Sequence, residues 1–207
     1  MKNADYMTII TELERLYPSP HCELRFENPF QLLIATLLSA QCTDMRVNEV
    51  TARLFAKYKT VLDFAAIEHA TLEDEIKTLG LFRAKAKNIR ALCRTLCEHY
   101  HGEVPRTMEE LLTLPGVGRK TASVVVFNAF GLPAMAVDTH VFRVSRRLGW
   151  ATGKTPLAVE EELCGLLPKD LWGRVHHLLI WHGRRLCYAR SPACAECPLQ
   201  ELVACRL

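Results

Sequence analysis

The stretch Leu114-Pro115-Gly116-Val117-Gly118-Arg119-Lys120 determines how the rest of this chain is interpreted. One helical pattern of apolar residues ends at its Pro-Gly turn, and a second begins immediately with Thr121-Ala122-Ser123-Val124-Val125. Two glycines so close together leave the turn free of side chains, so a phosphate can approach the backbone. The N–H groups that begin the second helix have no partner inside it and carry its positive dipole end. The stretch therefore predicts a phosphate-binding helical hairpin.

Lys120 lies in the first turn of the second predicted helix. A cation is electrostatically disfavoured there, which favours the neutral, nucleophilic form of the amine. The alternative is that Lys120 only contacts solvent or phosphate, and this segment alone does not separate the two. Further along, Asp138 in Ala136-Val137-Asp138-Thr139-His140 has the position of a helix N-cap.

The composition indicates an ordinary globular protein. Of 207 residues, 49% are hydrophobic and 24% are charged, and the net charge of +3 does not by itself indicate a nucleic-acid binder. Three local basic clusters do favour a polyanionic partner: Arg83 to Arg90, Arg143 to Arg147, and Arg184 to Arg190. With no signal peptide and no apolar segment long enough to span a bilayer, we expect a soluble, cytoplasmic monomer that does not bind membranes.

Helical spacing runs through the whole chain, and no window alternates with period two, so the predicted fold class is all-α. Pro29 begins a largely apolar segment, Phe30 to Ala40, that predicts a buried helix. Thr71 is a candidate cap, Thr107-Met108-Glu109-Glu110 fits a capping box, and Thr155-Pro156 places a cap before a first-turn proline. The turn at residues 131–133 is the expected boundary between two domains.

Four of the nine cysteines lie close together near the C-terminus, as Cys187, Cys194, Cys197 and Cys205. Four thiolates so near in sequence can close around a zinc ion or an iron–sulfur cluster, and their spacing does not distinguish the two. Cys93 and Cys97 are one helical turn apart, but a pair on an apolar helix face is more often core.

Taken together, these features resemble the endonuclease III family of helix-hairpin-helix DNA glycosylases and abasic-site lyases. The resemblance extends over nearly the whole chain, with five segments in the family's order. Two departures are visible: Cys42 stands where the family has alanine, and the last cysteine gap has seven residues rather than five. The matching segments are Leu38 to Asp44, Gly80 to Ala86, Leu114 to Ala122, Val137 to His140 and the four-cysteine loop.

The resemblance implies two helical domains that flank a DNA-binding cleft. A six-helix domain with the hairpin would occupy residues 22–132. The second domain would combine residues 1–21 with 133–207 and hold a [4Fe-4S] cluster in the loop 187–205. Lys120 would then face Asp138 across the boundary between the two domains.

The resemblance also implies the chemistry. Lys120 would attack the sugar carbon that carries a damaged base and form a Schiff base, so that β-elimination cuts the strand at the abasic site. Asp138 would stabilise the cationic sugar and help to deprotonate the amine. The substrate would be double-stranded DNA with an oxidised pyrimidine or an abasic site, bound through Gln41, Leu81, Gly116, Val117, Gly118, Arg119, Thr121, Arg185 and Arg190. Gln41 and Leu81 match the positions that fill the space left by the extruded nucleotide.

Two other functions compete with this one. A mismatch adenine glycosylase shares the hairpin and the cluster but usually lacks lysine at this position and carries an additional C-terminal domain. A non-enzymatic DNA-binding module would use the hairpin only to bind the DNA backbone. The combination of Lys120 with Asp138 argues against this alternative.

Overall fold

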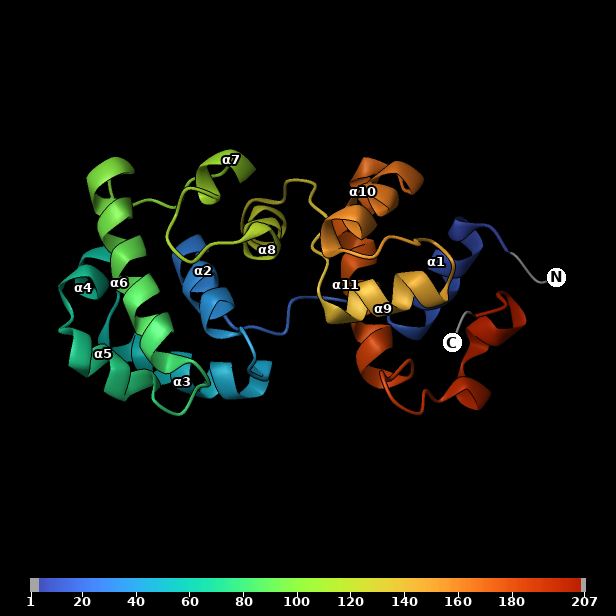
Figure 1. Ribbon diagram of the computed structural model, residues 1–207, viewed down its shortest axis with the longest axis horizontal. Helices are drawn as coiled ribbons and strands as arrows, with labels where there is room; N and C mark the ends of the chain where they lie inside the picture. The colour runs from blue at the N-terminus through green and yellow to red at the C-terminus, as the bar shows by residue number, and fades with distance from the viewer. Residues whose placement is uncertain (1–3, 206–207) are drawn as a thin grey trace. The chain divides into compact units, whose positions relative to one another are not determined.

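The computed structural model describes residues 4–205, and over that range it consists of α-helices and short 3-10 helices without a β-strand (Figure 1). The all-α prediction is therefore confirmed. The chain divides into two compact units, and the boundaries expected from the resemblance differ from this division by one residue. The terminal unit combines Met1–Cys22 with Pro133–Leu207, and the central unit is Glu23–Leu132. No helix in the described range is long and apolar enough to cross a membrane.

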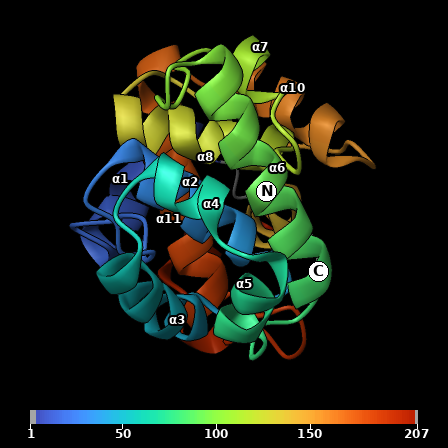
Figure 2. The same ribbon diagram turned by 90° about the vertical axis from the view of Figure 1, so that its left-hand side faces the viewer.

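The central unit contains seven helices, one more than the six expected. The additional helix is accounted for by short helices that are stabilised by residues at their own ends. In α4, for example, Thr60 and Asp63 form a reciprocal capping box at the N-terminus. Both α4 and α5 pack on the long helix α6 (Figure 2). The helices are α2 (Pro29–Leu38), α3 (Asp44–Lys57), α4 (Val61–Ala66), α5 (His69–Ile76), α6 (Phe82–His99), α7 (Met108–Leu111) and α8 (Arg119–Phe130).

Helix α2 is the centre of this unit. The Asn28 side chain caps it by accepting a hydrogen bond from the Gln31 N–H at 2.9 Å, and Leu32, Leu33 and Ile34 are completely shielded from solvent. A helix without a polar face has to be covered on all sides, and α2 contacts α3, α6 and α8. It ends at Leu38, two residues earlier than predicted, because the chain turns at Ser39 and Gln41 adopts a left-handed conformation.

The terminal unit joins both ends of the chain around one core. Its helices are α1 (Tyr6–Leu16), α9 (Thr139–Arg147), α10 (Pro156–Leu166) and α11 (Trp172–Arg185), with short 3-10 helices at Lys169–Leu171, Cys194–Glu196 and Pro198–Glu201. Each buried aliphatic side chain in such a core stabilises the fold by about 1.5–3 kcal/mol. The core includes Ile9, Ile10 and Leu13 of α1, Val141 and Val144 of α9, and Val175, Leu178 and Leu179 of α11.

Of the four caps predicted above, those at Asp138 and Thr155 form as expected, and two differ. Thr155 caps α10 as expected, with Pro156 in its first turn. Thr71 lies inside α5, which begins at His69 after Glu68, so the predicted cap was wrong. At Thr107 only half of the capping box forms, because the Glu110 carboxylate accepts from the Thr107 hydroxyl instead of from its backbone N–H.

A buried histidine in the terminal unit makes stability depend on pH. Burial, together with the neighbouring His176 and His21, lowers the pKa of His177 from 6.5 to about 3. As the pH falls below about 6.5, the unfolded chain binds a proton at this residue and the folded chain does not. The free energy of unfolding should therefore decrease by about 1.4 kcal/mol per pH unit until the folded-state pKa is reached.

Urea unfolding of the protein and its His177→Gln variant, measured from about pH 6.5 to about pH 4.5, tests this expectation. The variant should be less stable near neutral pH but should lose less stability on acidification. Parallel pH profiles for the two proteins would show that His177 contributes no such dependence.

Candidate functional site

The predicted hairpin is formed by α7, a tight turn and α8. The turn is closed by a hydrogen bond from the Val117 N–H to the Leu114 carbonyl oxygen at 3.1 Å. Gly116 has φ of +78°, and a Cβ atom there would lie 2.8 Å from Cβ of Asn88 on α6. Both its backbone conformation and its close contact with α6 therefore require glycine.

The N-terminus of α8 is well suited to an anion. Its N-cap is Gly118, no side chain caps the helix, and the first turn contains no acidic residue. A side chain at Gly118 would meet no other atom within 4 Å, so the space beside these N–H groups is open. Arg119 and Lys120 occupy the first two helical positions, where cations oppose the helix dipole unless an anion binds.

Lys120 is half-buried, whereas Gly118 and Arg119 are exposed. The residue that carries the amine thus lies in the first turn of α8, the turn proposed to bind a phosphate. An amine held next to a phosphate-binding turn can reach the sugar of the same nucleotide or its neighbour, which is the arrangement that nucleophilic attack on a sugar carbon requires.

Asp138 is the N-cap of α9, in the terminal unit. Its Oδ1 atom accepts hydrogen bonds from the backbone N–H groups of His140 and Val141, both at 2.8 Å. Both cap bonds use the same oxygen, and Oδ2 takes part in neither. The carboxylate can therefore cap the helix and still present one oxygen to a developing positive charge.

Gln41 and Leu81 share an uncommon backbone conformation. Their φ angles are 56° and 59°, in the left-handed region that glycine usually occupies, and both side chains are exposed. Leu81 retains 56% of its possible exposure, which is high for a large apolar residue. The two turns meet, because a Cβ atom on Gly80 would lie 3.8 Å from the Gln41 carbonyl oxygen.

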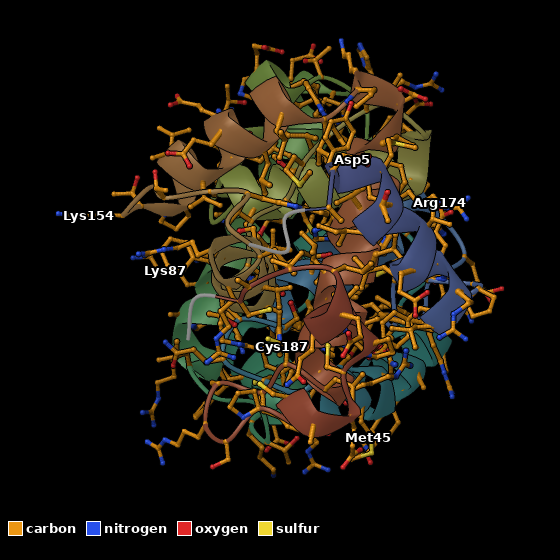
Figure 3. The ribbon with its side chains drawn as sticks, turned by 90° about the vertical axis from the view of Figure 1, so that its right-hand side faces the viewer. Asp5, Met45, Lys87, Lys154, Arg174 and Cys187 are labelled. Carbon is orange, nitrogen blue, oxygen red and sulfur yellow. The ribbon has the colours of Figure 1, made fainter. Side chains whose placement is uncertain are left out.

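The four cysteines of the C-terminal loop line a single cavity of about 180 Å³. Cys187 begins this loop directly after α11 (Figure 3). Among residues 4–205, no three potential ligand side chains converge on one point as ligands of a single metal ion do. Zinc would hold each sulfur within about 2.3 Å. Four thiols that line one cavity of this size can hold a group of several atoms, such as an iron–sulfur cluster.

The electrostatics of this cavity require a cationic occupant if all four thiols ionise. Burial raises the pKa of Cys197 and of Cys205, and the other cysteines raise both further. Arg147 offsets part of this repulsion, because its Nη1 atom donates to the Cys187 sulfur at 3.3 Å. Iron bound by the sulfurs would favour the thiolate forms much more strongly.

The arginines expected to form basic clusters have specific internal partners. Arg147 also donates to the carbonyl oxygens of Tyr188 and Ala189, and Arg143 donates to those of Cys187 and Gly183, so these two residues fix the loop to α9. Arg185 lies over the Trp181 ring, 3.7 Å from its centroid, but it is still exposed, as is Arg190.

Two buried polar side chains near these sites were not predicted from the sequence. Lys85 is only 6% exposed, so it does not belong to a solvated basic face of α6. His182 is 2% exposed, and its Nε2 atom lies 3.6 Å from the Cys197 sulfur. The signal that could have found them is spacing: Lys85 is four residues before buried Ile89, and His182 is four residues after buried Leu178, so each polar residue lies on an apolar helix face.

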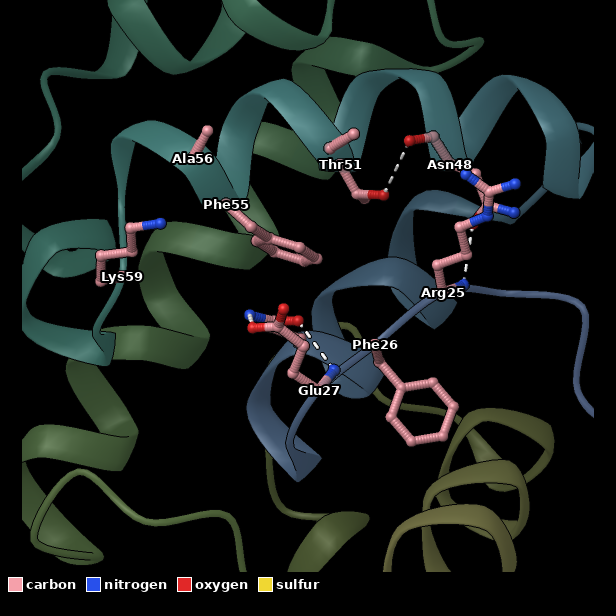
Figure 4. A pocket seen from close by; sticks show the side chains of 10 residues that line it. Arg25, Phe26, Glu27, Asn48, Thr51, Phe55, Ala56 and Lys59 are labelled. Atoms are coloured by element: carbon pink, nitrogen blue, oxygen red, sulfur yellow. Dashed lines mark hydrogen bonds between the residues drawn. The ribbon is translucent and has the colours of Figure 1, made fainter.

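A further cavity of about 380 Å³ lies between the start of α2 and α3 (Figure 4). The Asn48 amide at its edge is engaged with the backbone at both ends, donating to the Glu23 carbonyl and accepting from the Arg25 N–H. Gln31 likewise accepts from the Glu27 N–H. These contacts join the segment before α2 to its neighbours.

Comparison with known proteins relates these sites to one family. The family model described as "HhH-GPD superfamily base excision DNA repair protein" matches residues 34–169. A second model, the iron-sulfur binding domain of endonuclease III, matches residues 187–202, which include the first three cysteines of the loop and end before Cys205.

Individual relatives cover nearly the whole chain. Endonuclease III of Bacillus subtilis is 54% identical over 90% of this chain and 86% of that protein. Endonuclease III of Escherichia coli is 46% identical over 98% of this chain and 96% of its own. A solved structure of a trapped endonuclease III–DNA covalent intermediate is 52% identical with a TM-score of 0.92, over 97% of this chain and 93% of that one. The chain therefore belongs to the endonuclease III family of base excision repair enzymes, and it is a DNA glycosylase with AP lyase activity that carries a [4Fe-4S] cluster.

Proposed function

We propose that this enzyme removes oxidised pyrimidines from double-stranded DNA and cleaves the resulting abasic site through a Schiff base on Lys120. The observation that carries the proposal is an amine at the second position of α8, in a first turn with no acidic residue and no side-chain cap. A solved relative, 52% identical, is a trapped covalent endonuclease III–DNA intermediate, which supports a covalent route. We expect a monomer that acts in the cytoplasm.

The chemistry needs a neutral amine and a leaving base. The Lys120 nitrogen forms a bond to the sugar carbon C1′, and the bond from that carbon to the base breaks, with the electron pair leaving on the base. Opening of the sugar ring then gives a protonated imine. The imine acidifies the neighbouring C2′ proton, whose removal expels the 3′ phosphate by β-elimination, and water finally releases the lysine.

In this proposal Asp138 contributes its charge. A carboxylate stabilises the positive charge that develops on the sugar as the base departs, and it can accept the proton that the Lys120 ammonium must lose to become a nucleophilic amine. Oδ1 stays in the helix cap, which fixes the orientation of the carboxylate and of Oδ2.

Lys120→Gln should abolish covalent trapping. In the presence of borohydride, the unsubstituted protein should crosslink to duplex DNA that contains thymine glycol or an abasic site, because the reductant converts the imine to a stable amine. Arg119→Gln is the matched control: it should bind DNA less tightly but crosslink fully at saturating protein. Undiminished trapping by the Lys120 variant would place the nucleophile elsewhere.

Asp138→Asn separates the two roles of this residue. Asparagine caps helices about as well as aspartate, so folding and DNA affinity should be retained, while the missing charge slows base release by on the order of a hundredfold. Single-turnover rates with saturating enzyme measure the effect. A loss of only twofold to threefold would leave Asp138 with a capping role alone.

We also infer that Cys187, Cys194, Cys197 and Cys205 are the cluster ligands, since all four line the same cavity. Cys205→Ser should lower the iron content and speed the loss of visible absorbance in air. The control is Cys97→Ser. Cys97 is a half-buried cysteine on α6 in the central unit, so the iron content of this variant should be unchanged. Full iron content with unaltered stability in the Cys205 variant would assign the fourth ligand to another residue.

A further inference from the structure

The turns that carry Gln41 and Leu81 are strained and need support. The left-handed region is unfavourable for a non-glycine residue, and such conformations persist only where surrounding contacts impose them. Neither Gln41 nor Leu81 is held by its own side chain, since both are exposed. The support must therefore come from the backbone atoms around them.

Lys85 supplies contacts to both turns. Its Nζ atom donates to the Ala40 carbonyl oxygen at 2.8 Å and lies 3.2 Å from the Cys42 sulfur, so it holds the residues on both sides of Gln41. Its backbone N–H donates to the Leu81 carbonyl oxygen at 3.0 Å. The bond to Leu81 is the first backbone bond of α6 and does not depend on the side chain. The Lys85 side chain supports the Gln41 turn and joins it to the helix that Leu81 begins.

The burial of Lys85 destabilises the folded protein. Burying an ammonium group is costly, and Lys85 lies in the first turn of α6, where the helix dipole disfavours a cation. The compensation comes from the C-terminal end of α2, whose negative dipole end and following Ala40 carbonyl favour a positive charge. An apolar residue would continue the face of Ile89 and Leu92 at lower cost but could not hold the Gln41 turn.

We infer that Lys85 is a positioning residue that holds Gln41 and Leu81 together in the conformation that enters the DNA stack. This inference rests on the proposed function together with the expectation, drawn above from the family resemblance, that the two side chains occupy the space left by an extruded nucleotide. The Lys85 ammonium is engaged with Ala40 and Cys42, so we assign it no contact with the substrate sugar or base. It acts through the geometry of the two turns.

The role predicts a difference between substrates. Extrusion of a nucleotide that carries a base costs a few kcal/mol of stacking and pairing, while an abasic nucleotide has little stacking to lose. Loss of Lys85 should therefore slow the excision of a base much more than the cleavage of a preformed abasic site. A defect in overall folding would reduce both rates alike.

Lys85→Met in the full-length, cluster-containing protein provides the test. Methionine keeps most of the stem and removes the donor. Lys77→Met is the matched control, because Lys77 forms only a surface pair with Asp74 at 2.7 Å. Excision of thymine glycol should slow by about tenfold or more and abasic-site cleavage by less than about threefold, while iron content and melting temperature establish that both variants are folded.

A second measurement does not require base excision or strand cleavage. A fluorescent base analogue opposite an uncleavable abasic-site mimic brightens when its stacking is disturbed by inserted side chains. The unsubstituted protein and Lys77→Met should brighten it, and Lys85→Met should not at equal occupancy. Lys85→Arg, which keeps the charge and the donor, should recover more than half of the signal and serves as the second variant if methionine impairs folding.

The outcomes separate the inference from the proposed function. Equal loss on both substrates, full brightening by Lys85→Met, or an arginine variant that is folded but as defective as methionine would overturn the role of Lys85. If the unsubstituted protein excises no oxidised pyrimidine, the proposed substrate fails, and the fluorescence comparison still decides whether Lys85 positions the two turns.

Discussion

The complete burial of α2 is the constraint on which the central unit depends. Because this helix has no polar face, α3, α6 and α8 have to pack around it. The C-terminal end of α2 leads into the Gln41 turn, the N-terminal end of α6 carries Leu81, and the N-terminal end of α8 carries Lys120. A single apolar segment therefore fixes the positions from which the turns at Gln41, Leu81 and Lys120 project, and close packing makes those positions rigid.

The functional groups lie at helix ends, where backbone groups are unpaired and dipoles are uncompensated. At α8 the free N–H groups and two cations are arranged for a phosphate, whereas at α9 a carboxylate neutralises the same kind of terminus. At α2 and α6 a buried lysine joins a negative helix end to a positive one. In two of these three sites, at Lys120 and at Lys85, a positive charge lies near the positive end of a helix dipole. Each of these two lysines has a role in the function or the inference proposed above.

The sequence predicted features that depend on neighbouring residues. The hairpin follows from Pro115, Gly116 and Gly118, and the caps at Asp138 and Thr155 follow from side chains that reach only the next turn. Features that depend on distant partners were not predictable in the same way. Lys85 is buried because α2 ends beside it, and His182 meets Cys197 because the loop folds back on α11. The left-handed backbone at Gln41 and Leu81 likewise arises from packing, since neither residue type favours it.

The terminal unit is discontinuous, and this has a consequence for biosynthesis. Helix α1 leaves the ribosome first, but its partners α9 and α11 follow only after the entire central unit has been made. Ile9, Ile10 and Leu13 must stay uncovered through that interval, while the contiguous central unit can fold as it emerges. The cysteine loop comes later still, so the hairpin of α7 and α8 is complete before the four cysteines have been made. Assembly of the cluster therefore follows synthesis of all the helices, because the four cysteines that line its cavity begin after α11.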